Sequence, residues 1–268
     1  MTKTSRHDGW QSGDRYERYM GRWSRRIAPA FLDWLEAPSR SSWADIGCGT
    51  GALSASILAR CDPASIVAID PSTGFLETAR SSIFDARVAF CMGDAQTLPL
   101  SDASCDVVAS ALALNFVADK MTALSEMRRV VRPGGKIGFY VWDYPGGGIE
   151  FMRAFWNAAA ALDPAAADLT EDKRFPFCTP AGLTRLMADA GFDKIDCTAI
   201  EVPTVFRDFE DYWQPFTLGA GPAPSYCVSL DREARQRLEQ ELRESLPRLH
   251  DGSIHLKARA WALKAAVL

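Results

Sequence analysis

The stretch Trp43-Ala44-Asp45-Ile46-Gly47-Cys48-Gly49-Thr50-Gly51 decides the fold of this chain. Its apolar-leaning first half predicts a strand, three glycines follow at alternating positions, and a helical pattern begins after them. Because glycine has no Cβ, the backbone can turn sharply there and lie against a ligand. A helix that starts at such a turn directs its unpaired N–H groups and the positive end of its dipole at that ligand. The stretch therefore predicts the first strand–helix turn of an open α/β sheet that binds a nucleotide-like cofactor.

Asp45 separates two classes of cofactor. Gly47, Gly49 and Ala52 also satisfy the dinucleotide fingerprint, so an NAD-dependent oxidoreductase is an alternative. A carboxylate at the strand end repels a pyrophosphate and attracts a cation, and the methionine part of S-adenosylmethionine carries an ammonium group beside a sulfonium. The segment from Asp45 to Gly51 resembles the first motif of the class I S-adenosylmethionine-dependent methyltransferases.

Strands and helices alternate along the chain. Seven segments are predicted as strands: residues 42–46, 66–69, 87–91, 105–110, 136–142, 193–202 and 254–267. The last is rich in alanine, so a helix is an alternative there. The alternation implies right-handed βαβ units and therefore a doubly wound, mostly parallel, Rossmann-like seven-stranded α/β sheet with helices on both faces.

The resemblance covers residues 43–142 and plausibly 179–202, and the length of 268 residues fits one domain, so a single methyltransferase domain is predicted over residues 1–268. We expect an N-terminal cap helix at residues 10–37, a cofactor-binding half at 42–142 and a substrate half at 143–268. Helical lid insertions are expected near residues 149–178 and 206–247. Both insertions carry aromatic residues at helical spacing, which is typical of core packing or, alternatively, of an apolar lid over a hydrophobic acceptor.

Two further acids follow predicted strands. Asp70 ends the second strand, where one carboxylate can accept hydrogen bonds from both hydroxyls of a ribose. A turn or capping role before Pro71 is the alternative. Asp94 lies in Gly93-Asp94-Ala95-Gln96-Thr97-Leu98-Pro99, which resembles the family's G-D-A-x-x-L-P motif. That resemblance implies a hydrogen bond from the adenine amino group to Asp94.

The cofactor implied by the resemblance is S-adenosyl-L-methionine, with S-adenosyl-L-homocysteine as its product. The residues predicted to bind it are Asp45, Gly47, Cys48, Gly49, Gly51, Asp70, Pro71, Ser72, Asp94, Ala95, Gln96, Ala111 and Leu112. The pattern is most similar to that of the ubiquinone/menaquinone-biosynthesis methyltransferases. It implies in-line methyl transfer to a small molecule, driven mainly by proximity and orientation. A non-catalytic S-adenosylmethionine-binding module remains an alternative.

The acceptor site is less sharply defined, and no residue is assigned as a general base. Ligands of doubly wound sheets lie beyond the carboxyl ends of the strands, and an N-terminal helix can close over them. The candidate acceptor-binding residues are Tyr19, Trp23, Asn115, Phe116, Asp143 and Tyr144. Asn115 could instead cap a helix near Ala118, and residues 143–148 are predicted to form a flexible loop. We expect an apolar or aromatic acceptor.

Composition restricts the possible partners and compartment. The net charge is −4, the isoelectric point is about 5.5 and no basic stripe occurs, which argues against a nucleic-acid partner. Seven scattered cysteines without a C-x-x-C pair argue against a metal site and fit a reducing compartment. No signal-like or membrane-spanning apolar segment is evident. The expectation is a cytoplasmic monomer or homodimer without a metal.

Overall fold

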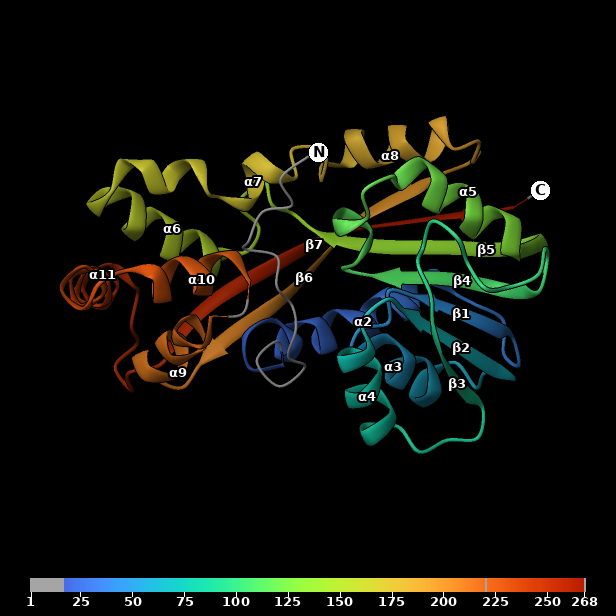
Figure 1. Ribbon diagram of the computed structural model, residues 1–268, viewed down its shortest axis with the longest axis horizontal. Helices are drawn as coiled ribbons and strands as arrows, with labels where there is room; N and C mark the ends of the chain where they lie inside the picture. Colours follow the sequence, from blue (N-terminus) through green and yellow to red (C-terminus); the bar gives the residue numbers. More distant parts are fainter. Residues whose placement is uncertain (1–16, 220, 268) are drawn as a thin grey trace. The chain divides into compact units, whose positions relative to one another are not determined.

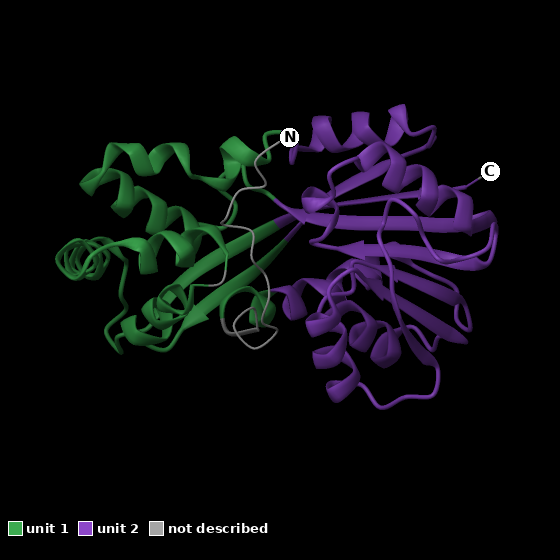
Figure 2. Cartoon of the chain, in the orientation of Figure 1, with its two compact units in different colours: residues 1–23, 143–176, 201–259 green, residues 24–142, 177–200, 260–268 purple. Residues whose placement is uncertain are grey.

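The computed structural model describes residues 17–219 and 221–267 (Figure 1). The chain divides into two compact units (Figure 2). Unit 1 comprises residues 1–23, 143–176 and 201–259, and unit 2 comprises residues 24–142, 177–200 and 260–268. All of the segment predicted to bind the cofactor, residues 42–142, belongs to unit 2.

The strands form one seven-stranded sheet in the order β3-β2-β1-β4-β5-β7-β6. They are β1 (Ser42–Ile46), β2 (Ser65–Asp70), β3 (Val88–Met92), β4 (Cys105–Ala111), β5 (Val131–Trp142), β6 (Asp196–Phe206) and β7 (Ile254–Ala266). The neighbouring pairs from β3 to β5 are parallel, and β7 runs antiparallel to β5. The predicted doubly wound, mostly parallel sheet is therefore confirmed, and the alanine-rich last segment is a strand.

Helices cover both faces of the sheet in unit 2 (Figure 1). Most of α2 (Arg22–Leu35), together with α3 (Ala52–Arg60) and α4 (Thr73–Ser82), lies on one face. The other face carries α5 (Lys120–Val130) and α8 (Pro180–Asp189). Because β4 is covered on both sides, its central residues are fully buried, as its continuous apolar sequence predicts.

Polar residues set the beginnings of three of these helices. The side chains of Ser72, Asp119 and Thr179 accept hydrogen bonds from backbone N–H groups in the first turns of α4, α5 and α8. Pro180 occupies the first position of α8, where its missing N–H is not needed. Ser72 and Thr179, residue types that favour this position, therefore cap α4 and α8. Asp119, which was not predicted, occupies the capping position of α5.

Several predicted boundaries were wrong. The described part of the N-terminal helix starts with a π-helical turn at Glu17–Gly21 before α2 begins, and residues 10–16 of the expected cap helix lie outside the described residues. The Gly-Pro-Ala-Pro stretch at residues 221–224 has the composition of a turn, yet it starts a helix, α10 (Pro222–Ser229), since proline fits the first turn of a helix. Strand β6 extends to Phe206 rather than ending at residue 202.

Unit 1 is built around aromatic side chains. Its helices are α6 (Glu150–Leu162), α7 (Glu171–Arg174), α9 (Phe209–Trp213), α10 and α11 (Arg232–Ser245). Phe155 of α6 stacks on Phe216, with ring centroids 4.4 Å apart and an interplanar angle of 7°. The two aromatic groups singled out in the sequence are buried here: Phe151, Phe155, Trp156, Phe206, Phe209, Tyr212, Trp213 and Phe216. The core-packing interpretation of both groups is confirmed.

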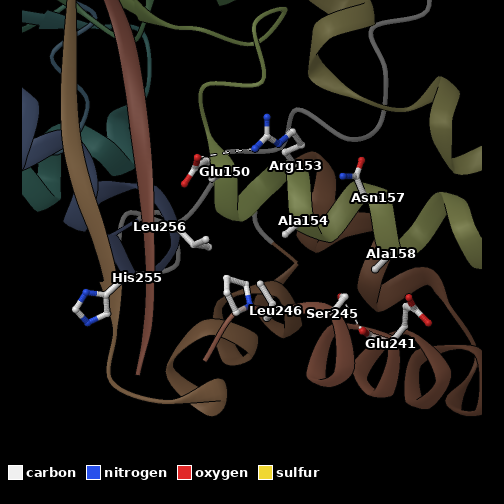
Figure 3. A pocket seen from close by; sticks show the side chains of 11 residues that line it. Glu150, Arg153, Ala154, Asn157, Ala158, Glu241, Ser245, Leu246, His255 and Leu256 are labelled. Carbon is white, nitrogen blue, oxygen red and sulfur yellow. Dashed lines mark hydrogen bonds and ion pairs between the residues drawn. The ribbon is translucent and has the colours of Figure 1, made fainter. Parts of the chain in front are cut away.

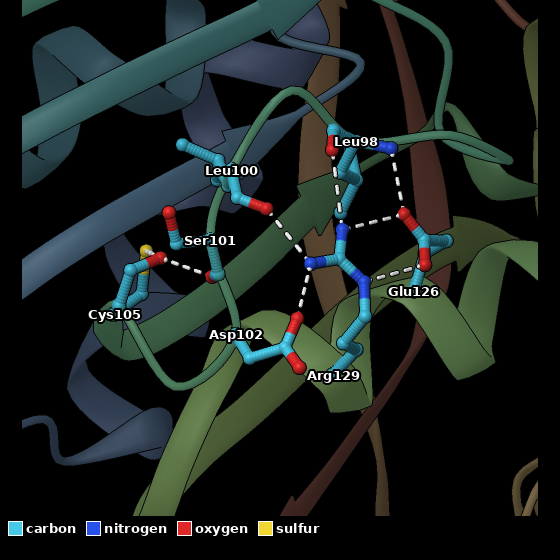
Figure 4. A network of polar contacts seen from close by, with 8 residues as sticks. Leu98, Leu100, Ser101, Asp102, Cys105, Glu126 and Arg129 are labelled. Carbon is cyan, nitrogen blue, oxygen red and sulfur yellow. Dashed lines mark hydrogen bonds and ion pairs between the residues drawn. The ribbon is translucent and has the colours of Figure 1, made fainter.

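Arg129 fixes the loop between β3 and β4 against α5 (Figure 4). Its guanidinium donates to the carbonyl oxygens of Leu98 and Leu100 at 3.1 and 2.8 Å, and to Asp102 at 2.7 Å. It also forms two 2.7 Å bonds with Glu126, whose carboxylate in turn accepts the Leu98 N–H at 2.8 Å. Charge-assisted hydrogen bonds of this kind are stronger than neutral ones. The loop is thus held by a network that a single arginine completes.

Replacement of Arg129 should therefore destabilise the chain. We expect Arg129→Gln to lower the free energy of unfolding by about 2 kcal/mol, since several charge-assisted bonds are lost and two carbonyl groups lose their partner. Thermal unfolding measures the effect as a drop of several degrees. The exposed Arg237→Gln in α11 is the matched control, and an equal effect of the two changes would contradict the role of the network.

Candidate cofactor and acceptor sites

The glycine turn after β1 is tied to the neighbouring strand. The N–H groups of Gly47 and Cys48 both donate to the carbonyl oxygen of Ile69 in β2, at 2.8 and 3.0 Å. Gly47 and Gly49 have φ angles of +70° and +55°, a region that favours glycine. A Cβ on Gly47 would overlap the Cβ of Ala113, whereas a Cβ on Gly49 would meet nothing within 4 Å. Gly47 is thus required by packing, and Gly49 borders open space that a ligand can approach.

Asp70 links this turn to the end of β2. Its carboxylate accepts the Gly49 N–H at 2.9 Å on one oxygen and the Ser72 N–H at 2.8 Å on the other. The alternative role of Asp70, in holding the turn before Pro71, is therefore confirmed. Since an ionised carboxylate has about four acceptor positions, two remain for ribose hydroxyls. Asp70 is 6% exposed, and its burial raises the pKa of the carboxyl. Its contact with a ribose stays a prediction.

Asp45 lies beneath the turn. The strand register places it between Ala68 of β2 and Ala109 of β4, and its side chain is fully buried. The Ser54 hydroxyl of α3 donates to one carboxylate oxygen at 2.6 Å, while the other has no partner within the described ranges. Burial raises the pKa of Asp45 to about 7. A buried acceptor without a donor is costly, so a nearby cation would be stabilising.

The loop after β3 brings Asp94 and Gln96 together. One oxygen of the exposed Asp94 accepts from the Gln96 backbone N–H at 2.8 Å and from its side-chain amide at 3.3 Å. The Gln96 amide oxygen accepts the N–H of Asp119 at 2.8 Å. Together with the bonds of Glu126 and Arg129 to Leu98, these contacts fix the loop that carries the predicted adenine site. Glu126 and Arg129 are three residues apart, so the sequence predicts an ion pair between them on one face of a helix. Nothing in the sequence indicates that both also bond to the loop at Leu98.

The end of β4 holds strained backbone. Leu112 has a φ angle of +56°, uncommon for a branched side chain, and its N–H donates to the Tyr140 carbonyl at 2.9 Å. Such strain persists only where its surroundings enforce it, and it concentrates at functional sites. Asn115 follows in a 3₁₀ turn. Its amide nitrogen is buried without a partner among residues 17–219 and 221–267, and Asp119, not Asn115, caps α5. The capping alternative for Asn115 is therefore wrong.

The remaining cofactor candidates surround these groups. Cys48 is buried in the turn, and burial raises the pKa of its thiol, which argues against a reactive cysteine. Pro71 and Ser72 follow Asp70, and Ala95 follows Asp94. Phe116, beside Asn115, is 42% exposed. Thus the structure brings the predicted cofactor residues to the carboxyl ends of β1, β2, β3 and β4 within unit 2.

Tyr19 and Trp23 lie in the aromatic core of unit 1. Each side chain is 2% exposed, and Trp23 packs against Phe206 at 5.2 Å between ring centroids. Their helical spacing is therefore explained by packing, and neither presents an open surface for an acceptor. The Tyr19 hydroxyl is nevertheless buried without a partner in the described part of the chain.

The loop that starts at Asp143 is tied down. The Asp143 carboxylate accepts from Arg259 at 2.7 Å and from the Gly146 N–H at 2.9 Å. Backbone hydrogen bonds join Asp143 to Arg259 and both of these residues to Gly148. The prediction of a flexible loop was wrong because these bonds close it. Asp143 and Tyr144 line a cavity of about 210 Å³ in unit 1.

Within the described residues, no cluster of three or more His, Cys, Asp or Glu side chains is arranged to hold a metal ion. None of the helices at residues 17–219 and 221–267 has the length and apolar character needed to cross a membrane.

Comparisons with known proteins identify the central domain. A family model described as a methyltransferase domain matches residues 44–139. A malonyl-[acyl-carrier protein] O-methyltransferase of Xylella fastidiosa is 37% identical over 43% of this chain and 39% of its own length. A ubiquinone/menaquinone biosynthesis C-methyltransferase of Dinoroseobacter shibae is 33% identical over 40% of this chain and 45% of its own. The chain thus spans less than half the length of these two curated relatives.

The solved structures agree on the fold. Phosphoethanolamine N-methyltransferase 2 of Haemonchus contortus, in complex with S-adenosyl-L-methionine, matches 96% of this chain and 57% of its own with a TM-score of 0.60. At 15% sequence identity this similarity concerns the fold alone.

Residues 44–139 form a methyltransferase domain, and the match and the two relatives support the class I S-adenosylmethionine-dependent type for it. The predicted family is confirmed, as is S-adenosylmethionine as the cofactor of that family. The residues present suit this cofactor, since the turn has open space at Gly49 and an unpartnered buried carboxylate oxygen at Asp45. The alternative of an NAD-dependent oxidoreductase is not supported.

The two glycines of the turn should respond differently to a methyl group. Gly47→Ala should prevent stable folding because its Cβ would overlap Ala113. Gly49→Ala should cost only about 1 kcal/mol of stability, the strain of a left-handed backbone, but should weaken S-adenosylhomocysteine binding because the methyl group enters the open space. Thermal unfolding and calorimetric titration measure the two effects. Unchanged affinity in Gly49→Ala would contradict a ligand at that position.

Asp45 should make the ligand-free chain less stable as the pH rises. Burial raises the pKa of this carboxyl from its usual 3.8 to about 7, so the folded state holds the proton more tightly than the unfolded state. Stability is therefore lost between about pH 4 and pH 7 at up to roughly 1.4 kcal/mol per pH unit, and the loss levels off above pH 7. Asp45→Asn should remove this part of the slope. Parallel pH profiles of the two proteins in thermal unfolding would refute the assignment.

Proposed function

We propose that the chain transfers a methyl group from S-adenosylmethionine to a small-molecule acceptor. The observation that carries the proposal is the glycine turn whose Gly49 amide is held by Asp70 next to open space. The domain match at residues 44–139 supports it. The acceptors of the two relatives, named for malonyl-[acyl-carrier protein] and for ubiquinone/menaquinone biosynthesis, differ from each other and leave the acceptor of this chain open.

The residues around the turn have separate tasks in this proposal. Asp70 would accept hydrogen bonds from the ribose hydroxyls, and Asp94 would accept one from the adenine amino group. The buried charge of Asp45 would favour the ammonium end, and the backbone of Ala111 and Leu112 would line the methionine part. The bound cofactor supplies an electrophilic methyl group on a positively charged sulfur. The protein can then act by holding the nucleophile near that methyl and in line with it.

The amide of Asn115 offers an additional polar contact at the carboxyl end of β4. Its unpartnered, buried nitrogen is a donor that an acceptor oxygen could satisfy. Asn115 would therefore orient the acceptor rather than act as a base, since a neutral amide does not accept a proton at ordinary pH.

Ligand-dependent thermal unfolding tests the proposal. S-adenosylmethionine or S-adenosylhomocysteine at a hundred times its dissociation constant should add about 2.7 kcal/mol of stability, and NADH should add none. Asp70→Asn should weaken S-adenosylhomocysteine binding at least tenfold, because its amide cannot accept from two backbone N–H groups and a ribose together. Asp33→Asn, which changes an exposed carboxylate in α2, is the matched control.

The outcomes separate the possible functions. Stabilisation by NADH alone would overturn the proposal. Stabilisation by the adenosyl compounds, without methyl transfer from labelled S-adenosylmethionine to any of a panel of phenols, amines and thioesters, would favour a non-catalytic binding module. Equal affinity in Asp70→Asn and wild type would contradict the ribose assignment.

A further inference from the structure

A second candidate site lies within unit 1. The cavity of about 210 Å³ is lined by residues from the loop after β5, from α6 and from α7, among them Tyr144, Trp156 and Glu171. A dry cavity of about 150 Å³ in another protein holds a benzene ring, so this volume accommodates one ring with a small substituent. Trp156 and Glu171 are each 5% exposed. The cavity is thus of ligand size and has a buried polar wall.

The buried carboxylate of Glu171 is the polar group of this wall. One carboxylate oxygen accepts the Trp156 indole N–H at 2.6 Å, and the other is buried with no partner in the described part of the chain. Burial raises the pKa of Glu171 to about 7, with the nearby Arg174 charge opposing the shift without cancelling it. Buried acceptors are almost always paired, so an unpaired carboxylate oxygen at a cavity indicates a missing donor.

The indole bond also fixes the direction of this group. Because Trp156 Nε1 is a donor only, it takes one oxygen of Glu171, and the other remains an unpartnered acceptor in a residue that lines the cavity. The Tyr144 ring, which stands 5.1 Å from that of Phe175, adds an aromatic wall. Burial, and to a lesser degree the Glu171 charge, raises the pKa of Tyr19, whose hydroxyl is also without a partner in the described residues. The cavity therefore combines aromatic surface with one strong acceptor.

A larger groove in the same unit lacks these features. It measures about 490 Å³ and lies between α6, α11 and the start of β7, with His255 and Glu241 among its lining residues (Figure 3). Within the described residues, none of its lining side chains carries a buried polar atom without a partner. The smaller cavity is the better-defined site.

We propose that the cavity beside Glu171 binds a small aromatic compound whose O–H or N–H donor bonds to the unpartnered carboxylate oxygen of Glu171. The proposal does not depend on the proposed function, because every residue that carries it belongs to unit 1. Glu171 is a binding and positioning residue in this account.

Titration of the full chain with small probes tests the inference. Phenol and benzylamine supply the two kinds of donor on one ring, and benzoate supplies the ring without a donor. We expect phenol or benzylamine to bind at least tenfold more tightly than benzoate and to shift the Trp156 indole N–H resonance. The comparison between phenol and benzylamine tells which donor the cavity prefers.

A pair of variants isolates Glu171. In Glu171→Gln the amide oxygen keeps the indole bond and the NH₂ group faces the cavity, so a donor replaces the acceptor. Binding of phenol and benzylamine should fall at least tenfold, and the preference over benzoate should disappear. Asp168→Asn removes an exposed carboxylate of unit 1 that does not line the cavity, and it should leave probe binding within twofold of wild type.

The two proposals fail separately. S-adenosylhomocysteine binding, measured on every variant, tests the proposed function and should not change in Glu171→Gln. Equal binding of all three probes, or no binding of any, would overturn the cavity assignment whatever the cofactor result. If Glu171→Gln does not fold, the indole resonance of the wild type decides, because a probe that leaves it unshifted does not occupy this cavity.

Discussion

The hydrogen bond from the Gly49 amide to the Asp70 carboxylate is the contact on which the candidate cofactor site depends. It joins the turn after β1 to the end of β2, and the same carboxylate accepts the N–H of Ser72, whose hydroxyl caps α4. One side chain therefore sets the turn, the strand end and the start of the next helix. A ligand that bonds to Asp70 meets a group already held in place, which reduces the entropy lost on binding.

Carboxylates that accept backbone N–H groups also fix other loops, both along this edge of the sheet and in unit 1. Asp94 holds the backbone of its own loop, Asp119 caps α5, and Asp143 closes the loop after β5 with the help of Arg259. Loops that surround ligands are ordinarily mobile, but here carboxylates that accept backbone N–H groups restrict them. The same carboxylates thus order the loops and are candidates for binding a ligand. To separate these two roles, a variant must keep one hydrogen bond of the carboxylate and remove another.

Much of the fold follows from local sequence. The glycine turn, the caps at Ser72 and Thr179 and the buried run of β4 are each encoded within about ten residues, and all were predictable. Contacts between distant segments were not. The bonds of Arg129 to the loop at Leu98 depend on how α5 packs, and the Asp143–Arg259 pair joins residues far apart in the sequence. The burial that leaves one oxygen of Glu171 without a partner likewise exists only after α6 and α7 have packed.

Core and site cannot be told apart by residue type alone. Tyr19 and Trp23 were predicted to bind the acceptor because an N-terminal helix can close over a ligand, but both side chains are buried in the aromatic core of unit 1. Glu171, in contrast, has no distinguishing pattern in the sequence. A charged residue inside a core attracts attention only once its burial and its missing partner are known.

The charge that the sequence assigns is not the charge of the folded chain. The formal value of −4 counts every carboxylate as ionised, including Asp45 and Glu171, whose folded-state pKa values are both about 7. Because burial raises both pKa values, each carboxyl holds its proton to a higher pH than a free one, and the native chain is less negative near neutral pH than its composition implies. Binding of a cation beside either group would release that proton to the solvent. The electrophoretic mobility of the chain therefore depends on whether a cation is bound beside Asp45 or Glu171.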